Sequence, residues 1–180
     1  PLLLVTSHFM AFTFVRPLLL SVSGFDTQWL GALLFAYGFA GIIGNFLAGV
    51  MAVRRTATTI IAISGGLLLT PLLFLAVGGS GIGGGMVLLA WGLAYGGVSV
   101  GLMTLMLKAA PGAVEIVAAL YVGVFNIGIA LGAWTGGQAV DRLGLSANLW
   151  LAAGCAAAAL LLSFGIRFME ANKQPGAAKD

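Results

Sequence analysis

A few side chains in this sequence have types that could do chemistry, and all of them are set in long apolar runs. His8 is the only histidine of the 180 residues, and an imidazole that titrates near neutral pH could bind a solute or carry a proton. Arg16 lies two helical turns further on and needs a partner or an interface if it lies in hydrocarbon. Asn126 lies deep in another apolar run, where its amide could hydrogen-bond a solute. Each has a structural alternative: packing against a neighbouring helix for His8 and Asn126, and an interfacial anchor for Arg16.

Aromatic side chains accompany these polar groups. Tyr37, Trp91 and Tyr95 could stack on a ring-bearing or apolar ligand, or pack in the core. Catalysis is not expected, because the only histidine lies in the first apolar run and no pair of aspartates lies deep in any run. The single cysteine, Cys155, cannot form an internal disulfide. We expect no catalytic residue, no metal site and no cofactor.

Composition sets the class of protein that must position these groups. Hydrophobic residues make up 61% of the chain and charged residues 7%, against about 25% charged in a soluble domain. So few charges cannot cover a water-soluble surface, which excludes a soluble enzyme, a nucleic-acid-binding protein and a disordered tail. The formal net charge of +3 is too small to indicate DNA. The expected surroundings are a lipid bilayer, with no nucleic acid as partner.

Uncharged runs predict the membrane-spanning helices. About 20 apolar residues cross roughly 30 Å of hydrocarbon, and the glycine-rich segment 78–85 divides one run that is too long for a single helix. The sequence predicts an all-α membrane protein with a six-helix bundle over residues 1–168 and a polar cytoplasmic tail over 169–180. The expected helices are 2–22, 29–52, 57–77, 84–107, 114–139 and 146–168.

Basic residues predict the orientation of these helices. With both ends on the cytoplasmic side, that side holds six Lys and Arg residues, and the outer side holds only Arg142 and, within the first helix, Arg16. Cytoplasmic loops carry an excess of Lys and Arg. We therefore expect an integral protein of the cell (inner) membrane with both ends of this segment in the cytoplasm.

The chain contains a weak internal repeat. A shift of 88 residues places Gly44 on Gly132, Gly49 on Gly137 and Arg54 on Arg142. The shift spans three helices, so the two copies have opposite orientations, as in the inverted three-helix repeats of secondary transporters. Small residues at a spacing of four, at Gly44 and at Gly128, Gly132 and Gly136, predict close helix contacts. These glycine faces either pack statically or slide during gating.

Polar and aromatic residues predict which helices face a pathway. The third and sixth helices are the plainest and are expected to be peripheral, whereas the first, second, fourth and fifth carry the larger polar and aromatic groups. The candidate substrate-pathway residues are His8, Phe12, Arg16, Tyr37, Trp91, Tyr95, Phe125 and Asn126. His8, Phe12 and Arg16 follow at a spacing of four along one stripe. Pro17 is expected to kink the first helix near Thr13, either as a gate or as a static bend.

Three motifs carry a resemblance to a known family. They are His8-Phe9-x-Ala11-Phe12-Thr13-Phe14-Val15-Arg16-Pro17, then Gly38-x-x-Gly41-x-x-Gly44-Asn45 closing with Gly49, and Asn126-x-Gly128-x-x-x-Gly132-x-x-x-Gly136-Gly137-x-x-x-Asp141-Arg142-x-Gly144. Over nearly its whole length the chain resembles the C-terminal six-helix half of a twelve-helix major facilitator superfamily transporter. Within that superfamily it resembles the drug:proton antiporter-1 group and its arabinose-efflux-like and purine-nucleoside-efflux-like permeases.

The resemblance implies a function, although the sequence departs from the family pattern at one loop. It implies efflux of a small solute such as a drug, sugar or nucleoside, by alternating access and with proton coupling. The expected gating or packing residues are Pro17, Gly44, Gly49, Gly128, Gly132, Gly136, Gly137, Asp141 and Arg142. At the loop after the second helix, Val53 stands where the family has aspartate, so a charge relay there is not expected.

The expected partners are a small-molecule solute, a proton and a missing N-terminal six-helix half. The chain begins at Pro1 rather than Met, and Glu115 only marks the start of the fifth helix, with no Asp or Glu deeper in any predicted span. Proton coupling usually requires an intramembrane carboxylate, which would then lie in the upstream half unless His8 serves. The alternative is a stand-alone six-helix channel or membrane-assembly protein.

Overall fold

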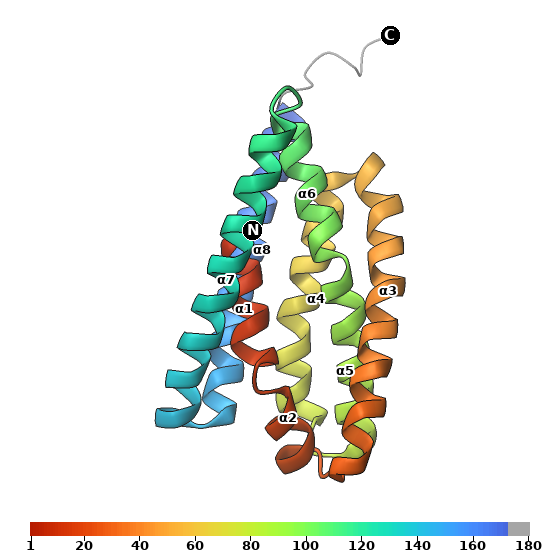
Figure 1. The fold of residues 1–180 in the computed structure, drawn as a ribbon, viewed down its shortest axis with the longest axis vertical. Helices are drawn as coiled ribbons and strands as arrows, with labels where there is room; N and C mark the ends of the chain where they lie inside the picture. The colour runs from red at the N-terminus through yellow and green to blue at the C-terminus, as the bar shows by residue number, and fades with distance from the viewer. Residues whose placement is uncertain (173–180) are drawn as a thin grey trace.

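The chain forms helices joined by short turns. The computed structural model describes the backbone of residues 1–172 and the side chains of residues 1–168, and these residues contain no strand (Figure 1). The all-helical fold is thus confirmed for them. In chain order the elements are α1 (Leu2–Phe12), α2 (Val15–Pro17), the π-helical turn η1 (Leu18–Val22), the 3-10 turn η2 (Thr27–Trp29), α3 (Leu30–Arg54), α4 (Thr56–Val77), α5 (Gly81–Gly96), α6 (Val98–Ala109), α7 (Val114–Leu143) and α8 (Leu145–Asn172).

The helices fall where the sequence predicts membrane spans. Five stretches are each long and apolar enough to cross a membrane: Thr27–Arg54, Thr56–Val77, Gly81–Ala109, Val114–Leu143 and Leu145–Phe168. The bent pair Leu2–Phe12 and Val15–Val22 makes a sixth if it is counted as one span. This set of helices is compatible with an integral membrane protein.

Some helix boundaries differ from the predicted ones. Ser80 caps α5 by accepting a hydrogen bond from the Gly83 N–H at 3.1 Å, so that helix begins inside the glycine-rich segment. The fifth helix runs on to Leu143 and takes Asp141 and Arg142 into its last turn. The apolar part of the last helix ends at Phe168, and the helical backbone of α8 continues to Asn172, into the segment predicted as a polar tail. The rest of that tail, residues 173–180, lies outside the described residues.

The first span is bent after Phe12. Its two parts meet at 47°, which confirms the kink predicted near Thr13, while a gating role for Pro17 stays a prediction. Pro17 has no N–H to offer the Thr13 carbonyl. The Phe14 N–H donates to Ala11 at 3.1 Å, one residue short of its α-helical partner Met10. The Asn148 amide of α8 fills that vacancy by donating to the Met10 carbonyl at 2.8 Å.

Most of the closely packed helix pairs are distant in sequence, and α4 with α5 is the consecutive pair among them. α1 packs against α7 and α8, α5 against α3 and α4, and α4 against α8. Figure 1 shows α1, α7 and α8 on one side of the bundle, α3 and α5 on the other, and α4 between them. The largest fully buried side chains, Trp91 and Phe74, come from α5 and α4.

Glycines bring two helix pairs into backbone contact, as the spacing of small residues predicts. Between α3 and α5, a Cβ on Gly44 would fall on the Leu93 carbonyl. Between α7 and α1, a Cβ on Gly132 would lie 2.6 Å from the Thr6 carbonyl oxygen, and one on Gly136 would lie 2.5 Å from that of Met10. A Cβ on Gly128 would instead meet a side chain, at 2.9 Å from the Val5 Cβ. Gly49 and Gly137 have ordinary room, with nearest atoms at 3.6 and 3.9 Å.

The third and sixth helices, which are expected to be peripheral, pack against each other through one face. α4 and α8 pack closely together, and the hydroxyls of Ser64 and Ser163 lie 3.2 Å apart in this buried contact. Their small and hydroxyl side chains form an interhelical contact of the kind common in membrane bundles. In this chain, α3 and α7 have more exposed surface than α4 and α8.

The Lys108 side chain forms hydrogen bonds at the end of the bundle where α3 is joined to α4. The Lys108 ammonium donates to the Val53 carbonyl and the Thr56 hydroxyl, both at 2.8 Å, and to the Ala52 carbonyl at 3.3 Å. The last carbonyls of α3 carry the negative end of the helix dipole. Lys108 therefore ties the end of α6 to the short α3–α4 connection.

Replacing Lys108 with methionine is expected to lower the free energy of unfolding by about 0.5–1 kcal/mol, because the exposed ammonium is partly screened by water. Thermal unfolding in detergent at low and high salt measures this loss, which should shrink as salt rises. Arg167→Met is the control. Arg167 is an exposed charge near the C-terminal end of α8, and its replacement should have no such effect. An equal loss in both variants would argue against a specific helix-end contact.

Candidate functional site

A buried histidine lies at the centre of an aromatic cluster. The His8 side chain, 2% exposed, accepts a hydrogen bond at Nδ1 from the Trp91 Nε1–H at 3.1 Å. Its ring stacks on Tyr95 with centroids 3.6 Å apart and an interplanar angle of 10°. Phe12 covers the imidazole at 4.9 Å. Since indole nitrogen only donates, His8 carries its proton on Nε2 in this arrangement and is neutral.

The aromatic cluster extends to a third helix. Phe12 stacks on Tyr37 of α3 with centroids 4.6 Å apart, and meets Trp91 edge-on at 5.7 Å. Aromatic pairs of this kind contribute about 0.5–1.5 kcal/mol each beyond the area they bury. The cluster therefore joins α1, α3 and α5 near the middle of the bundle.

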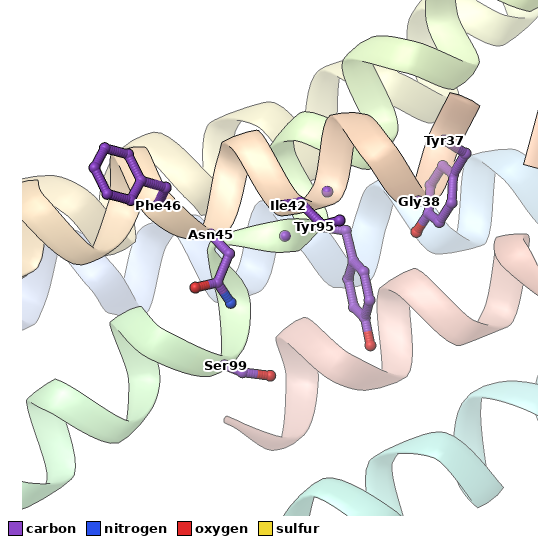
Figure 2. Close-up of a pocket in the computed structure, with 9 residues that line it drawn as sticks. Tyr37, Gly38, Ile42, Asn45, Phe46, Tyr95 and Ser99 are labelled. Atoms are coloured by element: carbon purple, nitrogen blue, oxygen red, sulfur yellow. The ribbon is translucent and has the colours of Figure 1, made fainter. Parts of the chain in front are cut away.

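An open groove of about 600 Å³ adjoins this cluster. It lies along α3, α5 and α6, and Figure 2 shows the side chains of Asn45, Tyr37 and Tyr95 on the same side of their helices, with Ser99 below them and Phe46 directed away. Glycines of α3 and α5 line the groove between these two helices, where Gly96 of α5 lies against the Gly41 carbonyl of α3. The groove thus presents hydroxyl, amide and aromatic groups on a backbone surface.

Two tyrosines line the groove, and a third lies on α7. Tyr37 and Tyr95 belong to the groove lining, and the ring of Tyr121 contacts Phe125 with centroids 5.5 Å apart. The hydroxyls of Tyr37 and Tyr121 are buried and have no partner in the described part of the chain, and neither has His8 Nε2. Unsatisfied buried polar groups are uncommon and call for a ligand, a water or a moving part.

The structure brings five of the predicted pathway residues into contact and leaves three apart. His8, Phe12, Tyr37, Trp91 and Tyr95 make up the cluster described above. Phe125 contacts Tyr121 at 5.5 Å. Asn126 is exposed and donates to the Val122 carbonyl of its own helix at 2.8 Å. Arg16 is exposed in α2, because the bend after Phe12 takes it off the stripe of His8 and Phe12.

Two residues near functional features were missed from the sequence. Asn148 was not identified, although a single amide inside an alanine-rich and leucine-rich helix signals a partner on another helix. Ser99 was also missed, and it stands at the centre of Gly97-x-Ser99-x-Gly101, which has the letters of a hydrolase nucleophile elbow. Such an elbow joins a strand to a helix, whereas here α5 leads directly into α6. Among the described residues, His8 Nδ1 accepts its hydrogen bond from Trp91 and not from Ser99.

The groove is built from neutral groups. None of its lining residues carries a formal charge. Within residues 1–168, no three His, Cys, Asp or Glu side chains come close enough to hold a metal ion. No protein-family model matches the sequence, so the assignment of a function depends on this geometry and on the motifs of the sequence.

Proposed function

We propose that this chain is one six-helix half of a secondary active transporter of the major facilitator type, and that it exports a small uncharged solute. The observation that carries the proposal is the groove of α3, α5 and α6, in which Asn45 and Ser99 lie beside the aromatic rings of Tyr37 and Tyr95. Transporters of this architecture hold their solute near the middle of the bilayer, between two bundles. The groove is open on one side, as a surface shared between two bundles must be.

The chemistry of the groove favours a particular kind of solute. Hydroxyl and amide groups hydrogen-bond neutral donors and acceptors, and aromatic faces stack on rings. A charged solute would lose its hydration here without gaining a counter-ion. Among the solutes implied by the resemblance, a sugar or nucleoside therefore fits better than a charged drug.

The helix packing supports the inverted-repeat part of the proposal. The α1–α7 contact joins the first and fifth spans, and the α3–α5 contact joins the second and fourth. In an inverted repeat, the first span corresponds to the fourth, the second to the fifth and the third to the sixth. The contact between the first and fifth spans then corresponds to the contact between the fourth and second. The same correspondence relates α1–α8 to α4–α5, and both members of each pair are seen. Both of the first two contacts are close backbone contacts at glycine.

The exposed surfaces of α3 and α7 support a second bundle as partner, and the positions of basic residues support the proposed membrane orientation. Only 11% of the most apolar window of the second span is buried, and 22% of that of the fifth, which leaves room for a second bundle against α3 and α7. Arg54 and Arg55 end α3, and Lys108 lies in the last turn of α6. Figure 1 shows these two helix ends at the end of the bundle that also holds the α6–α7 turn. That end is the cytoplasmic one under the rule for positive charge.

The proposal is tested by solute binding to the chain in lipid nanodiscs. A panel of a pentose, a hexose and a nucleoside is compared with a nucleoside monophosphate and an amino sugar by thermal stabilisation. We expect stabilisation by at least one neutral solute and by neither charged one. Asn45→Leu is expected to weaken binding about two- to tenfold, since one hydrogen bond contributes about 0.5–1.5 kcal/mol.

Matched variants on α6 provide the control. Ser99→Ala is expected to weaken binding, and Thr104→Val is expected to leave it unchanged, because Thr104 bonds only to its own helix at Val100. Equal binding by Asn45→Leu, Ser99→Ala and the unaltered chain would exclude the groove as the solute site. Unsaturable ion conductance from the chain alone in planar bilayers would favour the stand-alone channel instead.

A further inference from the structure

Tyr95 belongs both to the groove and to the histidine cluster. Its side chain lines the open groove, and its ring covers one face of His8 at 3.6 Å. A solute that displaces Tyr95 would therefore also uncover the imidazole. No other residue that lines the groove stacks directly on His8 in the described part of the chain.

His8 has one nitrogen in use and one idle. Nδ1 accepts the Trp91 hydrogen bond, and the Nε2–H has no acceptor. The titratable neighbours are phenols: Tyr95 on α5 stacks on His8, and Tyr37 on α3 lies behind Phe12. The third tyrosine, Tyr121 on α7, contacts Phe125. Among the side chains of residues 1–168, the hydrogen bond and ring contacts of His8 involve no carboxylate, lysine or arginine, and Arg16 on the same span lies beyond the bend. His8 is thus the one group of the cluster whose free side chain titrates near neutral pH, and it is neutral while it is buried among the aromatic rings.

We propose that His8 is the proton-binding residue of this bundle and that Tyr95 controls access to it from the groove. In this step, a proton from groove water binds Nδ1, and the neutral imidazole becomes an imidazolium. Trp91 Nε1–H then loses its acceptor, so the hydrogen bond between α1 and α5 is released. Loss of the proton to water restores the bond. The inference rests on the proposed function, because occupancy of the groove by solute is what moves Tyr95.

The single histidine makes access measurable without any transport assay. Diethyl pyrocarbonate modifies accessible neutral imidazole, and its absorbance reports only His8 because the chain has one histidine. In lipid vesicles free of any other protein, near neutral pH, we expect slow modification of the unaltered chain and about tenfold faster modification of Tyr95→Ala, as for removal of a local protecting contact of about 1.4 kcal/mol. Tyr95→Phe should behave as the unaltered chain. Tyr37→Ala removes another groove tyrosine that does not touch His8 and should also leave the rate slow.

A second measurement uses the unaltered chain, so that misfolding of a variant cannot decide the outcome. Nitrogen NMR of ¹⁵N-labelled His8 should show the neutral Nε2–H form at alkaline pH. On acidification Nδ1 should gain a proton while the Trp91 indole N–H signal shifts. An imidazole that stays neutral until the bundle unfolds would overturn the proposal, as would equal modification rates in Tyr95→Ala and Tyr95→Phe. If the modification rates and the NMR titration come out as expected but no solute binds the groove, the proposed transport function is refuted and the proton-binding role of His8 is retained.

Discussion

Replacing Gly44 with alanine is expected to separate α3 from α5 and to lower the free energy of unfolding by about 3 kcal/mol or more. The new Cβ would fall on the Leu93 carbonyl of α5 and lie 2.8 Å from its carbonyl carbon. Those atoms belong to helix backbone, so neither partner can turn aside as a long side chain would. The groove should be lost with the contact, because Tyr37 and Tyr95 lie on the two separated helices.

The matched control lies on the same helix. A Cβ on Gly38 would meet nothing within 4 Å, and alanine is favoured over glycine inside a helix by about 0.5–1 kcal/mol. Gly38→Ala should therefore leave stability unchanged or raise it, while Gly44→Ala lowers it. Unfolding in mixed micelles with increasing sodium dodecyl sulfate measures both. Equal stability of the two variants would mean that α3 and α5 do not touch at Gly44.

The same contrast is available on α7. Gly132→Ala would place a Cβ 2.6 Å from the Thr6 carbonyl oxygen, whereas Gly123 has open space. We expect Gly132→Ala to lower stability and Gly123→Ala to leave it unchanged or raise it. The same contrast on α3 and on α7 would support two equivalent helix contacts, as the inverted-repeat proposal requires.

The positions of the helices could be predicted from the sequence because they depend on local properties. A run of apolar residues as long as the hydrocarbon is thick must be helical to satisfy its own backbone. The bend of the first span is also local, since Pro17 lacks a donor whatever surrounds it. Glycine spacing predicted close contacts at Gly44 and Gly132 for the same reason.

The partners of individual side chains could not be predicted, because they are set by contacts between distant segments. His8 and Trp91 are 83 residues apart, and many rotations of their helices satisfy the same pattern of hydrophobicity. The position of Arg16 shows the consequence. A straight helix would align it with His8 and Phe12, whereas the 47° bend carries it to the exposed surface. Asn148 illustrates the reverse case, since its partner Met10 is 138 residues away and offers a carbonyl freed by that same bend.

Removing the Asn148 side chain is expected to have a large effect for this reason. Asn148 is 0% exposed, and in Asn148→Ala the Met10 carbonyl would lose the interhelical donor that the bend requires. An unsatisfied buried backbone group of this kind destabilises by about 1–3 kcal/mol, in addition to the cavity left by the amide. Asn148→Leu fills that cavity without restoring the donor, and should remain destabilised.

Asn126 offers the matched control, because its amide also donates to a backbone carbonyl at 2.8 Å, but on its own helix and at an exposed position. Asn126→Ala should change the free energy of unfolding by less than about 0.5 kcal/mol, and it should lower solute flux if Asn126 faces the proposed pathway. Unfolding in mixed micelles and flux in proteoliposomes, at matched protein content and with the partner bundle supplied, separate the two effects. An Asn148→Leu chain as stable as the unaltered one would contradict the role of this amide at the bend. An Asn126→Ala chain with full flux would remove Asn126 from the pathway and leave the aromatic groove of α3 and α5 to hold the solute.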